Sequence, residues 1–486
     1  FRGGDLVSNV TGVMDYSFGN YKVQPTSGAD YVSTNPRQVA PDDVGGTMKV
    51  AAFNVLNYFS TLDDSGSICG PLGDQGCRGA DDANEFTRQR DKIFEALADI
   101  DADVVGLIEI ENHATDEALI DLVDGLNAVV GAGTYDYVAT GPAGPDVIKV
   151  AFIYKPATVA LVGAPAVLDD PAFLDPRGYG DAKNRAAVAQ TFEEIGGGDP
   201  VTVVVNHLKS KGTPCGDPVD DNPETGSCNL TRTLAAEALA DWMATDPTGS
   251  GDGDVLIIGD LNAYDKEDPI DALRRGADDI AGTADDYTDL VLRDLGEEAY
   301  SYVFSGQWGY LDYAMAIQQT AAKVTDTTVW HINADEPDIL DYDTSFKKPA
   351  QQALYEKNAF RSSDHDPVIV GLAMTQVPIY DIQGDGDASP YEGEVVTTTG
   401  VVTGDFQGDE ALRGFYAQDV DGDGDPATSD GIFVFDRFSS EVDVSVGDLV
   451  EITGEVDEFF GETQLTDVTV TIVGTSAVPP TAIAMP

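Results

Sequence analysis

At 486 residues the chain is too long for one ordinary domain, so two or three domains are expected. Its 86 acidic against 27 basic residues give a formal net charge of −59, whereas an apolar content of 42% with 19 Phe and 19 Tyr excludes a disordered acidic chain. No apolar run is long enough for a transmembrane helix, so we expect no membrane insertion. We interpret the acid-rich composition as a halophilic surface, because salt at about 1 M shortens the Debye length to roughly 3 Å and screens self-repulsion.

Residues 1–46 are predicted to form an N-terminal β segment and a linker rich in Pro, Ser and Asp. The opening Gly4-Asp5-Leu6-Val7 is similar to residues 447–450, and the two segments continue to a Phe-Gly pair, Phe18-Gly19 and Phe460-Gly461. One interpretation is that the N-terminal segment is the last part of a second β unit whose start is missing. The alternative is that a Gly-Asp-hydrophobic opening is common to many unrelated strands.

Residues 47–375 are predicted to form a layered α/β domain, because apolar strand-like runs alternate with helical periods. The expected helices span residues 85–100, 115–130 and 231–244. The expected strands span residues 49–53, 103–110, 147–154, 186–192, 201–205, 255–258, 310–317 and 368–373.

The four cysteines form two local pairs, Cys69 with Cys77 and Cys215 with Cys228, in loops rich in Gly, Asp and Pro. Their spacing is not the tight Cys-x-x-Cys of a zinc site. An even count in short loops predicts two disulfides and an oxidising compartment. The alternative is four free thiols in a cytosolic protein.

Polar side chains stand at the ends of several predicted strands. An acid and an imidazole in Ser363-Asp364-His365 lead into one strand, and similar clusters end others; their residues are Asn54, Glu109, His207, Asp260, Asn262, Asp312, Asp364 and His365. A carboxylate at a strand end can hold or deprotonate water, and an amide or imidazole can contact a phosphate oxygen. Four such clusters in one region predict a single metal-and-carboxylate site.

Individual members of this set leave alternatives open. Glu109 and Glu111 are expected on one face of their strand, and either could bind Mg²⁺, which uses one or two carboxylates. Asp312 is flanked by apolar and aromatic residues, so if buried it needs a partner such as a histidine. Arg185 is the candidate phosphate-binding arginine, and a solvated surface arginine is the alternative.

In order and spacing, these residues resemble the endonuclease/exonuclease/phosphatase superfamily, the deoxyribonuclease I-like fold, over about residues 47–375. The loop from Cys77 to Ala80, the EIEN segment that begins at Glu109 and the NHLKSKG segment at residues 206–212 are similar to secreted bacterial extracellular nucleases. The resemblance implies a four-layer α/β/β/α sandwich and a secreted, extracellular or periplasmic, protein.

The resemblance also implies a role for each matching residue on the metal side of the site. Glu109 would bind Mg²⁺ or Mn²⁺, with Asn54 beside it and Asp364 supporting the metal.

On the catalytic side, the resemblance implies that Asp260 positions or activates the water and that Asn262 orients the phosphate. His365 would pair with Asp312, and His207 would contact the phosphate or protonate the leaving oxygen. Which group is the general base differs between members of the superfamily.

The substrate side of the site is less well defined by the sequence. The acidic partner of His207 is Asp146 by strand register, although the aligned position is alternatively Ile148. Arg185 and Lys209 are the predicted substrate-binding residues. Seven basic residues near the motifs are predicted to line a cleft for nucleic acid, namely Arg88, Arg90, Lys149, Lys183, Arg185, Lys209 and Lys211.

Residues 376–486 lose the helical periods and show short strands between Gly/Asp turns, which predicts a small all-β domain and a tail. This region resembles the oligonucleotide/oligosaccharide-binding (OB) type of β-barrel. Its Asp-rich loop has a calcium-loop spacing, with Asp in place of the usual Glu at the last position; the residues are Asp419, Asp421, Asp423, Asp425 and Asp430. Binding of Ca²⁺ and a plain hairpin-turn role both stay open.

The sequence therefore predicts a secreted, metal-dependent nuclease that hydrolyses extracellular DNA, with RNA as a further substrate, and that acts as a monomer. Its purpose would be phosphate acquisition or turnover of biofilm matrix in a saline habitat. The alternatives are a phosphomonoesterase or lipid phosphodiesterase of the same fold, and a non-catalytic matrix or adhesion protein.

Overall fold

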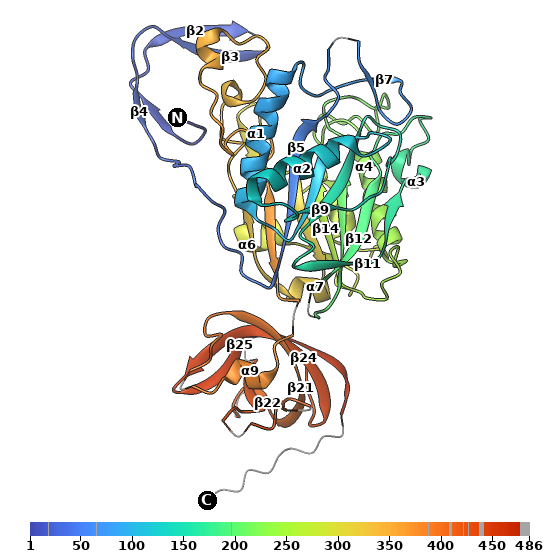
Figure 1. Ribbon diagram of the computed structural model, residues 1–486, viewed down its shortest axis with the longest axis vertical. Coiled ribbons are helices and arrows are strands. Elements are labelled where there is room, and N and C mark those ends of the chain that lie inside the picture. The colour runs from blue at the N-terminus through green and yellow to red at the C-terminus, as the bar shows by residue number, and fades with distance from the viewer. Residues whose placement is uncertain are drawn as a thin grey trace, which may run out of the picture.

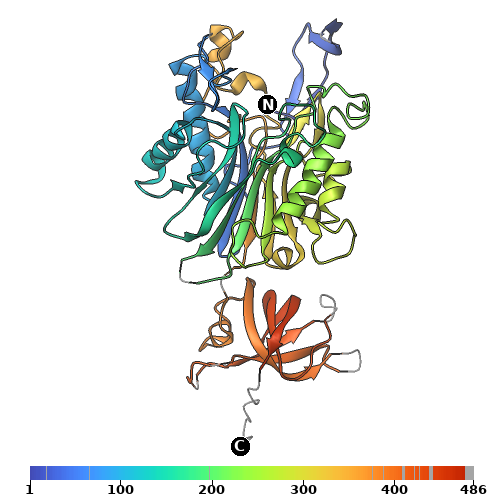
Figure 2. The ribbon, with the colours of Figure 1, turned by 90° about the vertical axis from the view of Figure 1, so that its right-hand side faces the viewer.

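The computed structural model describes residues 1–476 except residues 18, 65, 196, 375, 387, 408–410, 421, 426 and 437–441. A layered α/β body lies above a small β-barrel in Figure 1. Turned by 90°, the α/β body shows two sheets packed face to face with helices on both outer sides (Figure 2). The predicted α/β/β/α sandwich is thus confirmed. Within the described residues, no helix combines the length and apolar character needed to cross a membrane.

The first sheet has six strands in the order β19-β20-β5-β8-β10-β9. Their bounds are Val324–Val329 (β19), Val368–Leu372 (β20), Met48–Tyr58 (β5), Val104–Glu111 (β8), Ile148–Tyr154 (β10) and Asp136–Tyr137 (β9). Helices α1 (Ala83–Ile100) and α2 (Glu117–Val130) contact this sheet through β5 and β8. Asp82 caps α1 by accepting the N–H groups of Asn84 and Glu85.

The second sheet also has six strands, in the order β11-β12-β13-β14-β18-β15. Their bounds are Val159–Leu168 (β11), Ala187–Glu194 (β12), Val201–His207 (β13), Val255–Asp260 (β14), Asp312–Ile317 (β18) and Tyr287–Asp289 (β15). The helices that follow its strands or connect them are α3 (Pro171–Leu174), α4 (Asn229–Met243), α5 (Asp268–Leu273), α6 (Leu290–Leu295) and α7 (Gln318–Ala322).

The two sheets approach closely at Gly106 of β8. A Cβ atom on this glycine would lie 2.6 Å from Ile258 Cδ1 and 3.0 Å from Val205 Cγ2, so a larger residue would push the sheets apart. Val205 and Ile258 are fully or almost fully buried in the core between the sheets. This contact fixes how β8 of one sheet lies against β13 and β14 of the other.

The strand directions place four polar strand ends at one edge of the sandwich. Strand β5 is parallel to β8, and β13 is parallel to β14, so Asn54, Glu109, His207 and Asp260 stand near the carboxyl ends of their strands. Strand β18 is antiparallel to β14 and begins at the same edge, where Asp312 pairs in register with Asp260.

Shorter elements surround the sandwich. They are β6 (Ile68–Cys69), β7 (Gln75–Gly76), β16 (Tyr302–Phe304), β17 (Gln307–Gly309), η1 (Asp338–Leu340) and α8 (Pro349–Gln352). Both predicted disulfides form, Cys69–Cys77 and Cys215–Cys228, and no free cysteine remains. The bridges join cysteines separated by 8 and 13 positions, so each closes a short loop.

The N-terminal segment is a ribbon of two strand pairs, β1 (Leu6–Ser8) with β4 (Asp30–Val32) and β2 (Gly12–Ser17) with β3 (Asn20–Pro25). The turn of the β2–β3 hairpin follows the pair Ser17 and Asn20, and includes residue 18, which lies outside the described part of the chain. Met14 pairs with Val23 on its apolar face, and both side chains are about half exposed or more.

The C-terminal strands form a closed barrel in the order β21-β22-β23-β25-β24. Their bounds are Val395–Phe406 (β21), Gly414–Gln418 (β22), Gly431–Phe435 (β23), Asp448–Phe459 (β24) and Glu462–Thr475 (β25), and α9 (Ile379–Gln383) precedes them. The pair Phe459 and Glu462 closes the β24–β25 hairpin, and it corresponds to the pair Ser17 and Asn20 of the N-terminal hairpin. Here the equivalents of Met14 and Val23 are Val456 and Leu465, which are buried in the barrel core. The sequence repeat therefore corresponds to the same hairpin in the same register.

A buried lysine joins the sandwich to the barrel. Lys323 Nζ lies 2.9 Å from Asp254 Oδ2, 2.6 Å from Asp199 Oδ2 and 3.7 Å from Glu451 Oε1 of β24. Burial disfavours the ammonium, but these carboxylates outweigh it and raise the pKa of Lys323 above its usual range. One cation thus compensates three acids from both parts of the chain.

We predict that Lys323→Met lowers the free energy of unfolding by about 3–5 kcal/mol, because it leaves the buried Asp254 carboxylate unpaired. Lys357→Met is the matched control. Lys357 is half exposed beside Asp91 and Glu95, and its loss should cost about 1 kcal/mol or less. Urea unfolding of both variants measures the difference, and equal losses would contradict the role given to Lys323.

Candidate active site

The polar strand ends converge across the seam between the two sheets. His207 Nε2 of the second sheet lies 3.9 Å from Glu109 Oε1 of the first, and 3.5 Å from Asp260 Oδ2 on the neighbouring strand. His365, which precedes β20 of the first sheet, lies 4.0 Å through Nε2 from the same Asp260 oxygen. The structure therefore brings the predicted residues of both sheets into one cluster.

Glu109, and not Glu111, faces this cluster. Glu109 has a positive φ of 70°, accepts the N–H of Asn57 at 3.0 Å and accepts Asn54 Nδ2 at 3.4 Å. Glu111 is buried and accepts the backbone N–H groups of Ser60 and Thr61, so it holds the loop after β5. The backbone thus turns Glu109 toward the cluster and Glu111 toward the loop, and metal binding by Glu109 stays a prediction.

Asn262 orients the Asp260 carboxylate. Its backbone N–H donates to Asp260 Oδ1 at 2.8 Å, and its side-chain Nδ2 donates to Asp260 Oδ2 at 3.1 Å. A left-handed φ of 48° at Asn262 allows both bonds in one tight turn after β14. The same Nδ2 also donates to the carbonyl of Leu208, next to His207.

Asp312 and His365 form a buried pair, as the sequence predicted. Their Oδ2 and Nδ1 atoms are 2.8 Å apart. Two residues that the sequence analysis missed complete this pair. Ser301 Oγ donates to Asp312 Oδ2 at 2.6 Å, and the Tyr302 ring stacks on the His365 ring with centroids 4.5 Å apart. Their only sequence signal is the Tyr-Ser-Tyr segment before the strand that carries Asp312.

The charges in this cluster are set by burial and by neighbouring groups. Burial, reinforced by Asp312, raises the pKa of Asp260 to about 7. Burial alone would lower the pKa of His365, but Asp312 with Asp260 and Asp364 raises it well above the usual range. At neutral pH the His365 imidazole is therefore protonated, and it lies beside the Asp260 carboxyl, which can exchange a proton.

His207 has the opposite charge state. Burial, and then Arg185 and His365, lower its pKa well below the usual range, so it is neutral at neutral pH. Its predicted partner is wrong, because Asp146 binds Arg185 Nε at 3.0 Å and Arg78 Nη2 at 3.3 Å instead. In the described part of the chain no group hydrogen-bonds to His207 Nδ1.

The predicted basic cleft is smaller than the sequence suggested. Arg185 and Lys209 lie beside the cluster, as does Arg78, which the sequence analysis did not select. Burial, and then Arg185, lower the pKa of Lys209 to about 8. The remaining predicted cations are each paired with a carboxylate or a carbonyl, namely Arg88, Arg90, Lys149, Lys183 and Lys211. Lys149 in particular is buried against Asp116, so the seven do not form one surface.

The sequence profile of the Endonuclease/Exonuclease/phosphatase family matches residues 51–365. The chain belongs to this family. None of the curated proteins compared with the chain matches it.

The chain also matches several solved structures at low sequence identity. One is an endonuclease/exonuclease/phosphatase family protein from Bacteroides thetaiotaomicron, with 16% identity over 66% of this chain and 93% of that chain and a TM-score of 0.41. Another is the human Nocturnin catalytic domain with bound sulfate, with 15% identity over 69% and 98% and a TM-score of 0.41. A third is D. rerio TDP2 with a single-strand DNA product, with 13% identity over 66% and 97% and a TM-score of 0.39.

Enzymes of this family use divalent metal ions, and the oxygen-rich cluster fits such an ion. Burial and the nearby Asp364 carboxylate raise the pKa of Glu109, so a divalent cation held by these two acids would offset their repulsion. The Asn54 oxygen accepts the N–H of Leu56 at 3.0 Å, which turns its NH₂ group toward Glu109. In this arrangement Glu109 and Asp364 would hold the ion, and Asn54 would orient Glu109.

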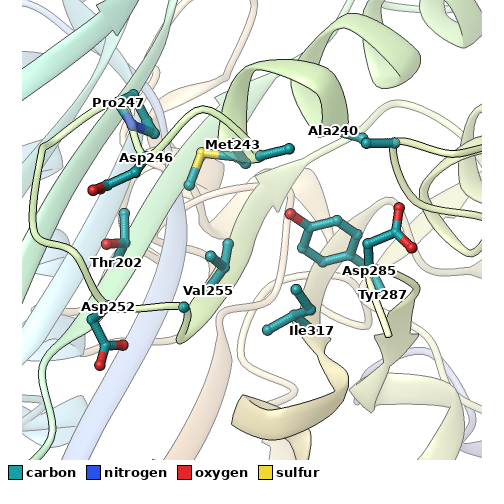
Figure 3. Close-up of a pocket in the computed structure, with 13 residues that line it drawn as sticks. Thr202, Ala240, Met243, Asp246, Pro247, Asp252, Val255, Asp285, Tyr287 and Ile317 are labelled. Carbon is teal, nitrogen blue, oxygen red and sulfur yellow. The ribbon is translucent and has the colours of Figure 1, made fainter. Parts of the chain in front are cut away.

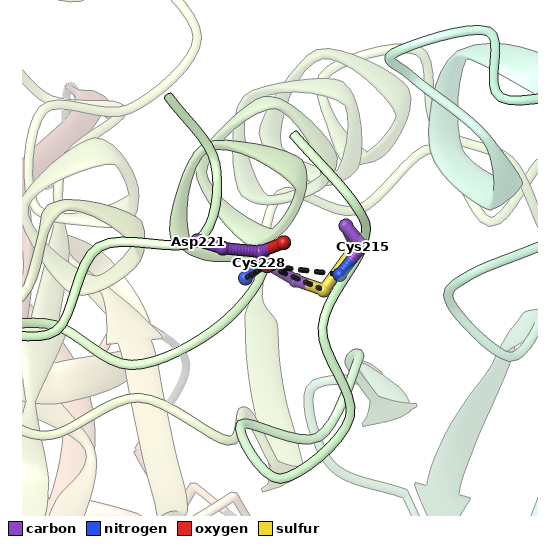
Figure 4. A group of neighbouring side chains, drawn as sticks. All are labelled: Cys215, Asp221 and Cys228. Atoms are coloured by element: carbon purple, nitrogen blue, oxygen red, sulfur yellow. Dashed lines mark hydrogen bonds between the residues drawn. A yellow bond between two sulfur atoms is a disulfide. The ribbon is translucent and has the colours of Figure 1, made fainter. Parts of the chain in front are cut away.

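Other groupings of potential ligands have different explanations. Asp260, Asp312 and His365 have ligand atoms within 4.8 Å of one another, but the hydrogen bond between Asp312 and His365 uses two of them. Cys215 and Cys228 lie beside Asp221 in Figure 4, yet the sulfurs are joined in a disulfide. Asp221 there accepts the backbone N–H groups of both cysteines.

The Asp-rich loop of the barrel connects two antiparallel strands, β22 and β23. Asp423 accepts the N–H of Asp425 and the hydroxyl of Thr428, Asp425 accepts the N–H of Ala427, and Asp419 accepts the N–H of Ile379. Asp430 lies close to Gly422, and Asp421 lies outside the described residues. These bonds are those of a hairpin connection, and Ca²⁺ binding stays a prediction.

A cavity of about 190 Å³ lies at the other ends of β13 and β14, away from the polar cluster. Figure 3 shows Met243, Val255, Tyr287 and Ile317 around it. Thr202 and Val255, which line it, lie near the starts of β13 and β14, whereas His207 and Asp260 are the last residues of these strands. This cavity is thus separate from the candidate site.

We predict that Asp260→Asn stabilises the metal-free protein at alkaline pH. The folded-state pKa of Asp260 is raised from 3.8 to about 7, so the folded protein binds a proton in this window that the unfolded chain releases. The free energy of unfolding therefore falls as pH rises from about 4 to about 7. The asparagine amide does not titrate, so the variant does not lose this stability.

Thermal unfolding in chelator should show the variant several degrees more stable at about pH 8, with the gain vanishing near pH 4. An equal gain at both pH values would contradict the charge assigned to Asp260.

We also predict that Asp312→Asn lowers the pKa of His365, because the Asp312 carboxylate contributes most to raising it. Imidazole signals followed by NMR through a pH titration measure this shift. The chain has only four histidines, so the spectrum is simple, and unchanged His365 signals in the variant would contradict this prediction.

Proposed function

We propose that the chain is a secreted, metal-dependent phosphodiesterase that hydrolyses nucleic acid, with DNA as the main substrate. The observation that carries this proposal is the charge pattern across the seam. A carboxyl with a pKa of about 7, Asp260, lies between a neutral imidazole and a protonated one, 3.5 Å from His207 and 4.0 Å from His365. Such a pattern suits attack of water on a phosphate diester.

Asp260 is the proposed general base. Its pKa near neutrality lets it accept a proton from water, and Asn262 fixes the direction of its carboxylate through two hydrogen bonds. His365 cannot take this role while its imidazole is already protonated. These observations support Asp260 as the base among the candidates that the resemblance left open.

Positive and neutral donors would bind the phosphate. Protonated His365, held by Asp312, stabilises negative charge on the phosphate and can give a proton to the leaving oxygen. Neutral His207 donates a hydrogen bond, and Arg185 beside it contributes a permanent positive charge. A divalent cation at Glu109 and Asp364 supplies Lewis-acid polarisation of the phosphoryl oxygen when bound.

The composition and disulfides support a location outside the cell in a saline habitat. Two disulfides persist in oxidising compartments, and a net charge of −59 is tolerated where salt screens it. Extracellular DNA is then the accessible polymeric source of phosphate.

A second candidate, hydrolysis of phosphomonoesters, is favoured by one observation. Arg78, Arg185 and Lys209 lie beside the cluster, and Lys149 is buried against Asp116, which leaves a small footprint for a long polyanion. A small phosphate ester would need no more.

The test is hydrolysis of plasmid DNA, single-stranded DNA, RNA and p-nitrophenyl phosphate with Mg²⁺, with Mn²⁺ or with chelator. We expect cleavage of DNA only with metal, and a fall of at least about a hundredfold in Asp260→Ala and His365→Ala. His113→Ala is the matched control, because His113 pairs with Glu117 outside the cluster.

Equal turnover in chelator would reject the metal mechanism. Cleavage of the monoester alone would replace the nuclease by a phosphatase, and full activity in Asp260→Ala would reject the site.

A further inference from the structure

His331 stands at the polar edge of the sandwich, outside the cluster that the proposed reaction uses. It follows the end of β19 by two residues, and β19 ends at the edge where β20 begins because these strands are antiparallel. The pairing continues beyond the strands, where the N–H of Trp330 donates to the carbonyl of Pro367 at 3.1 Å. The Asn333 side chain then donates to the carbonyl of His365 at 2.6 Å. His331 therefore lies alongside the segment that carries His365.

The strand order of the first sheet puts the polar groups of this edge in a row. In the order β19, β20, β5 and β8, they are His331, His365, Asn54 and Glu109. Arg185 lies beyond them, bonded to the loop that precedes β10. Neighbouring strands are about 4.8 Å apart, so His331 is set off from His365 by roughly one strand spacing, on the side opposite Arg185.

The His331 imidazole is held firmly for a side chain at the surface. Its Nδ1 lies 2.9 Å from Oδ2 of Asp366, a buried carboxyl that also accepts the N–H of Asn333 at 2.7 Å. The Tyr300 ring stacks on the imidazole, with centroids 3.9 Å apart and planes at 4°. The Tyr300 hydroxyl is fixed in turn, because it donates to Asp335 at 2.8 Å. These contacts set both the plane and the direction of the His331 ring.

The same construction holds His365 in the cluster. Its Nδ1 lies 2.8 Å from Asp312 Oδ2, and the Tyr302 ring stacks on its imidazole. Ser301 joins the two units, since its hydroxyl donates to Asp312 and its carbonyl accepts the N–H of Asp366 at 2.8 Å. The polar edge thus carries two adjacent histidine–aspartate pairs, each covered by a tyrosine.

The two units differ in what the second ring nitrogen faces. Nε2 of His365 lies 4.0 Å from the Asp260 carboxyl, inside the cluster. For His331, the hydrogen bonds and ion pairs of the ring to other described residues are all made by Nδ1, and 29% of the side chain is exposed. Nε2 of His331 is therefore open to a ligand. A surface imidazole that is already fixed in direction loses little conformational freedom on binding one.

An anion is the ligand that this geometry suits. An imidazolium with a carboxylate at Nδ1 keeps one N–H to donate, and a phosphate oxygen is a charge-assisted acceptor for it. The nearby Asp335 carboxylate is compensated by Arg2, whose Nη2 lies 3.0 Å from it. A metal ion fits less well, because within the described residues no group of three potential metal ligands includes His331.

The position of His331 supplies a cation where the cluster otherwise lacks one. Arg78 and Arg185 bind the loop before β10, and Lys209 lies with them near His207. A polynucleotide that runs along the polar edge would meet these three cations at one end of the row and His331 at the other. Contacts of cations with successive phosphates are the main source of affinity for nucleic acid.

We propose that His331 binds the phosphate next to the scissile one in a nucleic-acid strand, with Nε2 as the donor while Asp366 holds Nδ1. This inference rests on the proposed nuclease function and adds a substrate-positioning residue to it. A substrate with a single phosphate gains nothing from this subsite, whereas a substrate with a second phosphate on that side does.

The test is hydrolysis of the internal linkage of three thymidine dinucleotides by the full chain with Mg²⁺. TpT carries one phosphate, pTpT carries a second at the 5′ end, and TpTp carries it at the 3′ end. In the parent protein we expect one of the two longer substrates to have a KM about tenfold below that of TpT, because it gains a charge-assisted hydrogen bond.

Two variants test whether His331 causes this ratio of KM values. His331→Gln keeps a donor for Asp366 but carries no charge, so the ratio should fall to less than about twofold, through KM rather than kcat. His331→Arg keeps both the donor and the charge, and should retain most of the ratio. A purely structural role would change KM for TpT and for the longer substrates by the same factor and leave their ratio at the parent value.

His113→Ala is the matched control. His113 also pairs with an acid, Glu117, but lies outside the row, so this variant should keep the parent ratio.

Equal KM values for all three substrates in the parent protein would overturn the subsite and leave the proposed hydrolysis intact. A parent ratio that persists in His331→Gln would do the same, as would a ratio lost as fully in His331→Arg as in His331→Gln. Failure to cleave the internal linkage of any of the three would instead reject the proposed function, and the subsite with it.

Discussion

The face-to-face packing of the two sheets is the constraint on which the candidate site depends. Gly106 allows β8 to lie directly against Val205 and Ile258, so the carboxyl ends of parallel strands from both sheets meet at one edge. Glu109 comes from one sheet, and His207 with Asp260 from the other. If a larger side chain at Gly106 held the two sheets further apart, these groups would separate. The distances between their side-chain atoms are only 3.5 to 4.0 Å, so the cluster tolerates little displacement.

Burial at this seam has an energetic cost that the structure offsets only in part. Asp312 and His365 compensate each other, and Ser301 holds the carboxylate in place. Asp260 and Glu109 keep raised pKa values because burial is stronger than the compensation they receive. Under-compensated carboxyls of this kind are typical of functional sites, and a bound cation would offset the excess negative charge.

The charge is distributed unevenly over the molecule. Positive groups near the cluster are few, and Arg185 is shared with Asp146. The barrel is almost free of basic residues. Lys323 joins these two regions because it sits between acids of both. The same chain thus combines a few cations beside the cluster with an acidic barrel.

The sequence by itself determined a layered α/β domain, an all-β C-terminal region, both disulfides and the polar residues at the strand ends, because strand periodicity, glycine turns and paired cysteines are local properties of the chain. The four-layer sandwich followed from the family resemblance. The sequence could not predict which of Glu109 and Glu111 faces the cluster, since a positive φ at Glu109 breaks the strand alternation. Tertiary structure alone decided the partners: Tyr302 stacks on His365, Asp146 binds Arg185, and Asp116 binds the buried Lys149. Those contacts join distant segments, and their energies depend on burial and charge that exist only in the folded chain.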